Sequence, residues 1–275
     1  MFTGVFAFLF LSSSGCATAL SSFSPAHVPQ KGKFQAEAGI DISVPTGSIS
    51  RTIDEAKDAA AVASSTGKLS TDEKLRVFDA GVILLLNPPA VLQHAGLAYA
   101  PLRRTEVSVR FVGAGWRLGG RYQLLEQGVN SSWDLSMGLG ATRQTFSFPV
   151  DNVIDILRID DFRRYTIDLP MAFGRRGTWY RIWGGPRLLY TTGHTQMTLT
   201  IPGSNQPEVA TADSSGFFYG TQTGFALGYK HVFLGFELNL VKFKGNADLT
   251  ALGSVRRVNL DTFVVYPGIA LMGEF

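Results

Sequence analysis

The chain has one cysteine, four histidines and little charge. A single cysteine excludes an intrachain disulfide and a metal cluster built on cysteine. The histidines show no His-x-x-x-His or similar spacing, so no metal site and no cofactor is expected. Charged residues make up 17 % of the chain, and its net charge is +3 without any run of Lys or Arg. This balance argues against a nucleic-acid partner.

Glycine and aromatic residues are abundant instead. The 275 residues include 30 Gly, 12 % aromatic and 45 % hydrophobic residues. A chain of this composition is too apolar to be disordered and can bury a sizeable core. The combination is more typical of strands than of helices.

Residues 1–30 contain no Asp, Glu, Lys or Arg. Their apolar part, residues 2–11, is half the length of roughly 20 residues that a spanning helix needs. It is typical of the hydrophobic region of a secretory signal, so residues 1–15 are predicted to be a signal peptide. The basic residues that usually precede such a region are missing, which leaves open a start upstream of Met1.

The sole cysteine follows this segment in the run Ser13-Ser-Gly-Cys16. The run resembles a bacterial lipobox, with Ser13 where Leu is customary. The resemblance implies that Cys16 becomes the lipidated first residue, followed by a tether over residues 16–32. The alternative is a plain signal peptide cut near 17–19, which discards Cys16.

Strict alternation begins at Phe34 and continues to Val44, which predicts a strand with one apolar and one polar face. Two capping boxes follow, Thr52-Ile-Asp-Glu and Ser70-Thr-Asp-Glu. They predict two helices over residues 53–86, ended by Asn87-Pro-Pro. The stretch 45–92 is therefore expected to be a helical loop inserted between the first and second strands.

Alternation resumes near Gln93 and persists to the C-terminus, giving ten predicted strands in total. Segments of about 9–14 residues suit a tilted bilayer crossing. Aromatic residues gather towards their ends, as at a membrane interface. We therefore predict an all-β fold, a ten-stranded antiparallel transmembrane β-barrel over residues 33–275. Long connections are expected at 45–92, 147–161, 196–214 and 245–258, all on one side of the membrane.

The segment from Gly96 to Leu124 resembles the repeated hairpins of Gram-negative outer-membrane β-barrel proteins. The closing segment, residues 263–275, resembles their C-terminal assembly signal and ends in Phe275, although Pro267 and Gly273 replace the usual larger apolar residues. The resemblance implies a location in the bacterial outer membrane. It also implies two partners, outer-membrane lipid and the barrel-assembly machinery.

The chain has no Gly-x-Ser-x-Gly elbow. An omptin-like protease, also a ten-stranded barrel, would use Asp160, Asp161 and His194, but no Asp-x-His occurs on a facing strand. The sequence therefore predicts no enzyme.

The polar face carries six acids and six bases, and every base is Arg. We predict that they pair across a narrow lumen, and the set is Glu37, Asp41, Glu106, Arg110, Arg117, Arg121, Asp134, Arg164, Asp168, Arg181, Arg187 and Glu237.

A lumen filled in this way predicts a barrel with a structural or surface-interaction role. The helical loop 45–92 would bind an unknown extracellular partner or plug the lumen. One alternative is a narrow channel gated by that loop. The other is a soluble lipocalin-like carrier, whose apolar face would point inward.

Overall fold

The computed structural model describes residues 18–46, 58–59, 61–63, 65–66, 68–86, 88–113, 115–145, 156–201 and 206–275. Within these ranges ten antiparallel strands close into one barrel, in which each strand pairs with its sequence neighbours and β1 pairs with β10. The predicted fold class is confirmed. The strands are β1 (Phe34–Thr46), β2 (Ala90–Leu102), β3 (Thr105–Val112), β4 (Gly115–Leu125), β5 (Asp134–Thr145), β6 (Leu157–Arg176), β7 (Tyr180–Leu199), β8 (Glu208–Tyr229), β9 (Val232–Ala251) and β10 (Ser254–Glu274).

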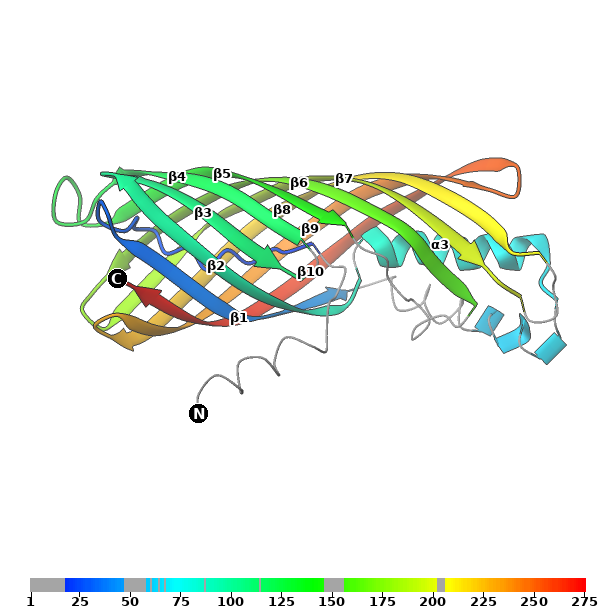
Figure 1. The fold of residues 1–275 in the computed structure, drawn as a ribbon, viewed down its shortest axis with the longest axis horizontal. Coiled ribbons are helices and arrows are strands. Elements are labelled where there is room, and N and C mark those ends of the chain that lie inside the picture. Colours follow the sequence, from blue (N-terminus) through cyan, green and yellow to red (C-terminus); the bar gives the residue numbers. More distant parts are fainter. Residues whose placement is uncertain are drawn as a thin grey trace.

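The two ends of the barrel differ (Figure 1). At one end β1 begins and β10 stops, and Phe34 and Phe275 exchange two backbone hydrogen bonds of 2.9 Å. We call this the terminal end. The opposite end carries the α-helix α3 (Thr71–Leu86), and we call it the α3 end.

Strands β6 to β10 are longer than predicted, with 20 to 22 residues each. The neighbouring strands stop early, since Thr46 of β1 pairs with Phe263 and Thr145 of β5 pairs with Arg163. Beyond those positions β6 to β10 form a five-stranded sheet, which we call the outer extension. The predicted long connections at 196–214 and 245–258 are therefore wrong. Only two residues, Leu252 and Gly253, turn β9 into β10, both with positive φ as a tight hairpin allows.

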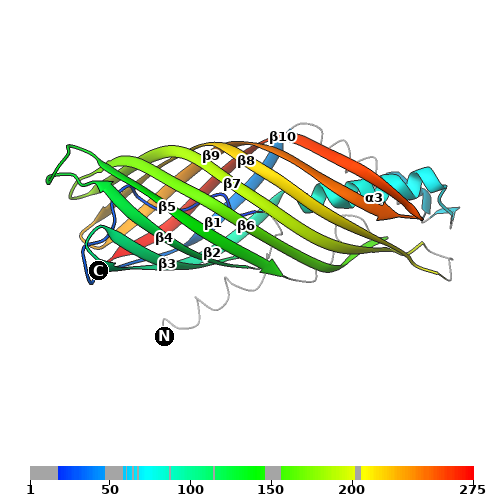
Figure 2. The ribbon, with the colours of Figure 1, turned by 90° about the horizontal axis from the view of Figure 1, so that it is seen from above.

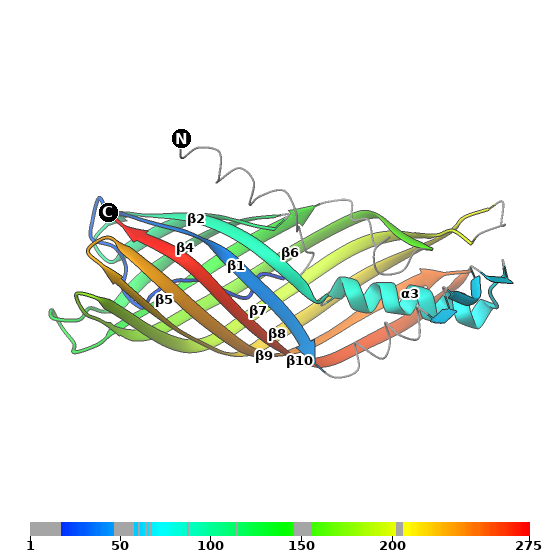
Figure 3. The same cartoon turned by 90° about the horizontal axis from the view of Figure 1, so that it is seen from below.

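Helix α3 lies against the inner face of the outer extension (Figures 2 and 3). Its start matches the predicted capping box: the Ser70 backbone amide donates to the Glu73 carboxylate at 2.8 Å, and the Glu73 amide donates to the Ser70 hydroxyl at 3.3 Å. Residues 58–59, 61–63 and 65–66 are also helical, whereas the capping box at 52–55 falls outside the described residues. No helix in the described ranges is long and apolar enough to span a bilayer.

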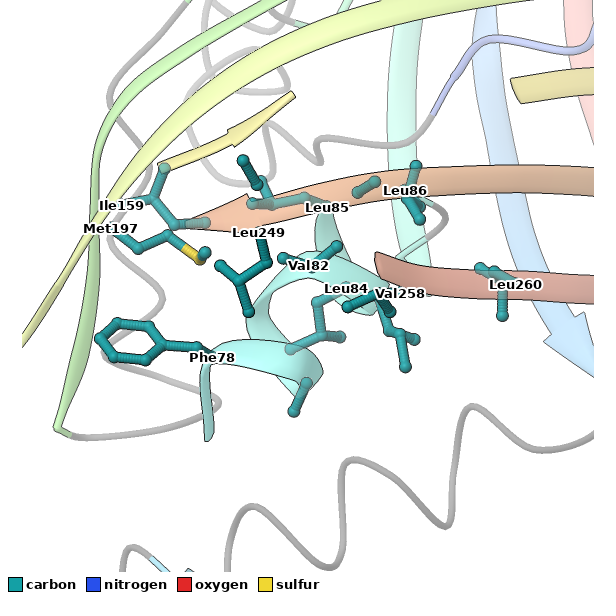
Figure 4. Close-up of a cluster of buried hydrophobic side chains, with 14 of the residues drawn as sticks. Phe78, Val82, Leu84, Leu85, Leu86, Ile159, Met197, Leu249, Val258 and Leu260 are labelled. Atoms are coloured by element: carbon teal, nitrogen blue, oxygen red, sulfur yellow. The ribbon is translucent and has the colours of Figure 1, made fainter. Parts of the chain in front are cut away.

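The core of the α3 end is apolar (Figure 4). Phe78, Val82 and Leu85 of α3 are buried against side chains of the outer extension, among them Met197 and Leu249. The inward positions of the outer extension are therefore apolar and in part small, as in Ala210, Ala212 and Ala247. Nearer the terminal end, many inward positions are polar.

Residues 18–30 do not form an exposed tether. They run through the inside of the barrel, drawn as a blue trace in Figure 1, and we call them the plug segment. Leu20, Phe23, Ala26 and Val28 are each at most 3 % exposed. Hydrogen bonds join the plug segment to the lumen wall along its length. They fix its position although it forms no helix or strand.

Candidate functional site: the plugged lumen

Between the terminal end and the outer extension, the outward face of each strand is mostly apolar and exposed, while the predicted lumen charges point inward. This distribution is the reverse of a soluble carrier barrel and matches a wall that faces lipid. Exposed residues that show it, two from each strand, are Ile42, Val44, Val91, Leu97, Val107, Val109, Trp116, Leu118, Met137, Leu139, Ile167, Leu169, Ile182, Tyr190, Phe217, Phe225, Leu234, Phe236, Ile269 and Leu271.

The apolar belt is bounded on both sides. At the terminal end Trp133 stacks on Phe173 with ring centroids 4.9 Å apart, and Tyr229 is exposed. On the outer extension, outward positions become charged and form ion pairs, such as Lys242 with Asp261 at 3.1 Å. A belt of apolar side chains edged by aromatic and then charged residues is the pattern of a bilayer crossing.

Asp168 of β6 is the centre of one charge cluster in the lumen. Arg117 donates to its two carboxylate oxygens at 2.9 and 2.8 Å, and Arg187 reaches the same carboxylate at 3.3 Å. Arg187 is 1 % exposed, so its charge is held by Asp168 and by the backbone carbonyl of Leu20 at 2.9 Å.

Two further predicted groups are brought together. Arg121 holds Glu106 with hydrogen bonds of 2.9 and 2.6 Å. Arg110 lies 2.7 Å from a Glu37 oxygen and 3.9 Å from an Asp41 oxygen. Paired in this way, buried charges avoid the large cost of an isolated ion.

The other four predicted lumen residues have partners outside the predicted set. Asp134 pairs with Arg176 at 3.3 Å, and Arg181 pairs with Glu274 at 2.7 Å. Both partners lie at strand ends and are not among the predicted lumen residues. Arg164 donates to the Thr18 hydroxyl at 3.1 Å and to the carbonyl of Leu85 in α3.

Glu237, the fourth, binds the main chain of the plug segment. Its carboxylate accepts from the backbone amides of Ser22 at 2.7 Å and Phe23 at 2.8 Å, and from the Trp183 indole at 3.2 Å. The plug is thus fixed to β9 by charge-assisted hydrogen bonds, which are stronger than neutral ones.

The plug continues towards the terminal end. Its Pro25 carbonyl accepts from Arg121 at 2.7 Å, and the His27 ring lies 3.0 Å from the Glu274 carboxylate. At Val28 the backbone amide donates to Gln123 at 3.0 Å. The direction of the chain is therefore from the α3 end, at Thr18, to the terminal end.

His94 was not predicted to take part, yet it forms a buried polar group with the plug. Its Nδ1 lies 3.1 Å from Asp41, whose carboxylate also accepts from the Ser21 hydroxyl at 2.5 Å. The ring stacks on Phe23 at 5.1 Å. Glycine makes room for this contact: a Cβ added at Gly268 would lie 2.2 Å from Asp41 and 3.0 Å from the Phe23 ring.

A small cavity lies beside the middle of the plug. A cavity of about 30 Å³ lies between plug residues 22–24 and the charged side chains of Glu37, Arg110 and Arg117. Since a water needs roughly 10–15 Å³ by this kind of measure, the cavity has room for a water or two. In the described part of the chain, no cluster of His, Cys, Asp and Glu could hold a metal ion.

The remaining predicted residues lie elsewhere. Cys16 and the signal segment fall outside the described residues, and Phe275 is exposed beside His231, with ring centroids 5.9 Å apart. The protease candidates are engaged in surface ion pairs: Asp160 with Arg158, Asp161 with Arg163 and His194 with Asp213.

No protein-family model matches the chain, and no curated protein matches it. Among solved structures it is similar to Ail, the attachment invasion locus protein of Yersinia pestis, at 12 % identity and a TM-score of 0.31 over 90 % of this chain and 100 % of that one. It is also similar to the N-terminal β-barrel domain of Pseudomonas aeruginosa OprF, at 10 % identity and a TM-score of 0.22 over 88 % and 98 % of the two chains. A third is CymD, a monoaromatic hydrocarbon channel, at 7 % identity and a TM-score of 0.27 over 90 % and 89 %. At these values the likeness supports no shared activity, and the architecture rests on the strand pairing itself.

Proposed function

We propose that the chain is an integral β-barrel of the bacterial outer membrane with a structural or surface-interaction role and a closed lumen. The plug segment carries this proposal. Its backbone and side chains bond to Arg187, Asp41, Glu237 and Arg121 along the barrel, and the charge pairs occupy the space around it. A path for solutes would require the plug to leave.

Conductance in planar bilayers tests the closed lumen. We expect no stable steps from the intact protein, and steps from a variant that lacks residues 18–28. If the deletion variant also showed no conductance steps, the charge pairs alone would be sufficient to close the lumen. Reproducible steps from the intact protein would contradict the proposal and favour the narrow channel.

The membrane location is tested separately. The apolar belt predicts that the protein stays in the membrane fraction after salt and carbonate washes and migrates differently on gels before and after boiling. Release into the soluble fraction would favour the lipocalin-like carrier instead.

Lipidation of Cys16 is part of the same proposal. It rests on the lipobox-like run Ser13-Ser-Gly-Cys16. Metabolic labelling with a fatty acid should mark the wild type and not Cys16→Ala. Equal labelling of the two would show that the signal peptide is a plain one.

A further inference from the structure

The outward wall contains a groove that the closed-lumen role does not use. It has a volume of about 750 Å³ and lies across β7 to β10, with Trp133 and Phe173 at one edge. Pockets that bury small ligands are about 300–1,000 Å³ and mostly apolar. The groove is therefore large enough to take a ligand segment.

Its floor is a row of four residues, of which Gly184, Thr223 and Pro267 are small and Leu238 is large. In the sheet register Gly184 pairs with Thr223, Thr223 with Leu238 and Leu238 with Pro267. All four lie on the outward face, because they alternate with the buried Trp183, Gln222, Glu237 and Tyr266.

The adjacent row is large and forms a wall. Ile182 pairs with Phe225, and Phe225 pairs with Phe236, whose rings stack with centroids 5.1 Å apart. A row that has Gly184 and Pro267 at its two ends, beside a row with two stacked aromatic rings, leaves a step in the surface. The step explains why the groove exists at this place.

We propose that the groove binds one acyl chain of a membrane phospholipid. The groove is continuous with the apolar belt, so under the proposed membrane location it is surrounded by acyl chains. The buried polar groups behind it, Trp183 and Glu237, are bonded to each other at 3.2 Å. Thr223 supplies the only polar side chain among the four floor residues, which fits a hydrocarbon ligand.

The experiment uses the full-length protein in phosphatidylethanolamine–phosphatidylglycerol vesicles with a spin label on the phospholipid acyl chain. Electron paramagnetic resonance measures the motionally restricted lipid per barrel. Gly184→Leu fills the groove, and an added Cβ there meets only the Gln222 carbonyl at 3.3 Å and Thr223 beyond. We expect this variant to lose one restricted chain per barrel.

Gly120→Leu is the matched control. Gly120 is also an outward glycine, between Leu118 and Tyr122, and an added Cβ would meet only the Glu106 carbonyl at 3.5 Å. It should keep the wild-type value. Equal values for Gly184→Leu and wild type, or an equal loss in both variants, would overturn the acyl site.

A failure of the proposed function looks different, because a barrel that is not a membrane protein would not float with the vesicles at all. That result overturns both proposals. Should Gly184→Leu fail to fold, Thr223→Phe fills the same groove from β8 and should give the same loss.

Discussion

The carboxylate of Glu237 accepts a 2.8 Å hydrogen bond from the backbone amide of Phe23. The two residues are 214 positions apart, and Glu237 is 2 % exposed. The neighbouring amide of Ser22 donates to the same carboxylate. One side chain of β9 thus accepts hydrogen bonds from two backbone amides of the plug. Substitution of Glu237 therefore tests directly what holds the plug in the lumen.

Glu237→Ala should loosen the plug. The change leaves two buried amides without their acceptor, and an unsatisfied buried donor costs about 1–3 kcal/mol. We expect hydrogen exchange of the Ser22 and Phe23 amides to accelerate while the strands stay protected. Glu126→Ala, in the connection between β4 and β5, is the control. Unchanged exchange at Phe23 would show that the plug is held elsewhere.

Arg121→Ala should destabilise the whole barrel. It leaves the buried Glu106 carboxylate without its two hydrogen bonds and frees the Pro25 carbonyl. Removing one partner of a buried ion pair costs about 3–5 kcal/mol. Denaturant unfolding followed by the gel shift between folded and unfolded forms measures the loss.

The control for that measurement is Arg103→Ala. Arg103 pairs with Glu126 at 3.2 Å but its side chain is 67 % exposed, so the change should cost no more than about 1 kcal/mol. Equal losses in the two variants would mean that burial does not decide the value of these pairs.

Gly268→Ala should disturb the contact between Phe23 and His94. The new Cβ would approach Asp41 to 2.2 Å, so Asp41 or the plug must shift. Overpacking of this kind costs about 1–3 kcal/mol. The temperature at which the folded band disappears on gels should fall, whereas Gly120→Ala should leave it unchanged. Equal temperatures would show that the plug adapts.

The strands and α3 were predictable because their signals are local. Alternation from Phe34 to Val44 and the hydrogen-bonding residues Ser70 and Glu73 lie within a few positions of one another. The outer extension was not predictable, because its inward positions hold apolar residues such as Ala210 and Ala212. The alternation of apolar and polar residues that marks the rest of each strand is therefore lost there. α3 covers those alanines, and only the folded chain shows it.

The plug could not be predicted for a related reason. Residues 18–30 have no periodicity, and most of their hydrogen bonds to the barrel wall join residues far apart in the sequence, such as Thr18 and Arg164. Alternation predicted the inward charges, and eight of the twelve pair within the predicted set, but the partners of the other four were not predicted. Arg181 pairs with Glu274, which sits next to the C-terminal Phe275 and was counted only as part of the assembly signal.

The start of α3 should respond to acid. Hydrogen bonds from the Ser70 hydroxyl and from the Ser70 backbone amide lower the pKa of Glu73 below its ordinary 4.5. A carboxyl whose pKa is lowered by folding stabilises the folded state above its ordinary value, and this contribution disappears as the pH falls through the lowered value. The first turn of α3 should therefore fray in acid. Hydrogen exchange over residues 71–78, corrected for the intrinsic rate, should lose protection as the pH falls below the ordinary value of 4.5 and through the lowered pKa.

Two variants test whether Glu73 is the cause. Glu73→Gln keeps an acceptor for the Ser70 amide but cannot take up a proton. In this variant the amides of the first turn should be less protected from exchange at neutral pH, and their protection should not fall further in acid. Asp72→Asn removes the neighbouring acid of the same turn, which has no hydrogen bond to Ser70 among the described contacts. This variant should therefore keep the pH dependence of the wild type. A wild-type profile that is flat, or one that becomes flat in Asp72→Asn and not in Glu73→Gln, would contradict the role of the capping box. Because α3 contacts all five strands of the outer extension, fraying confined to its first turn should leave the exchange of Leu84, Leu85 and Leu86 unchanged at either pH.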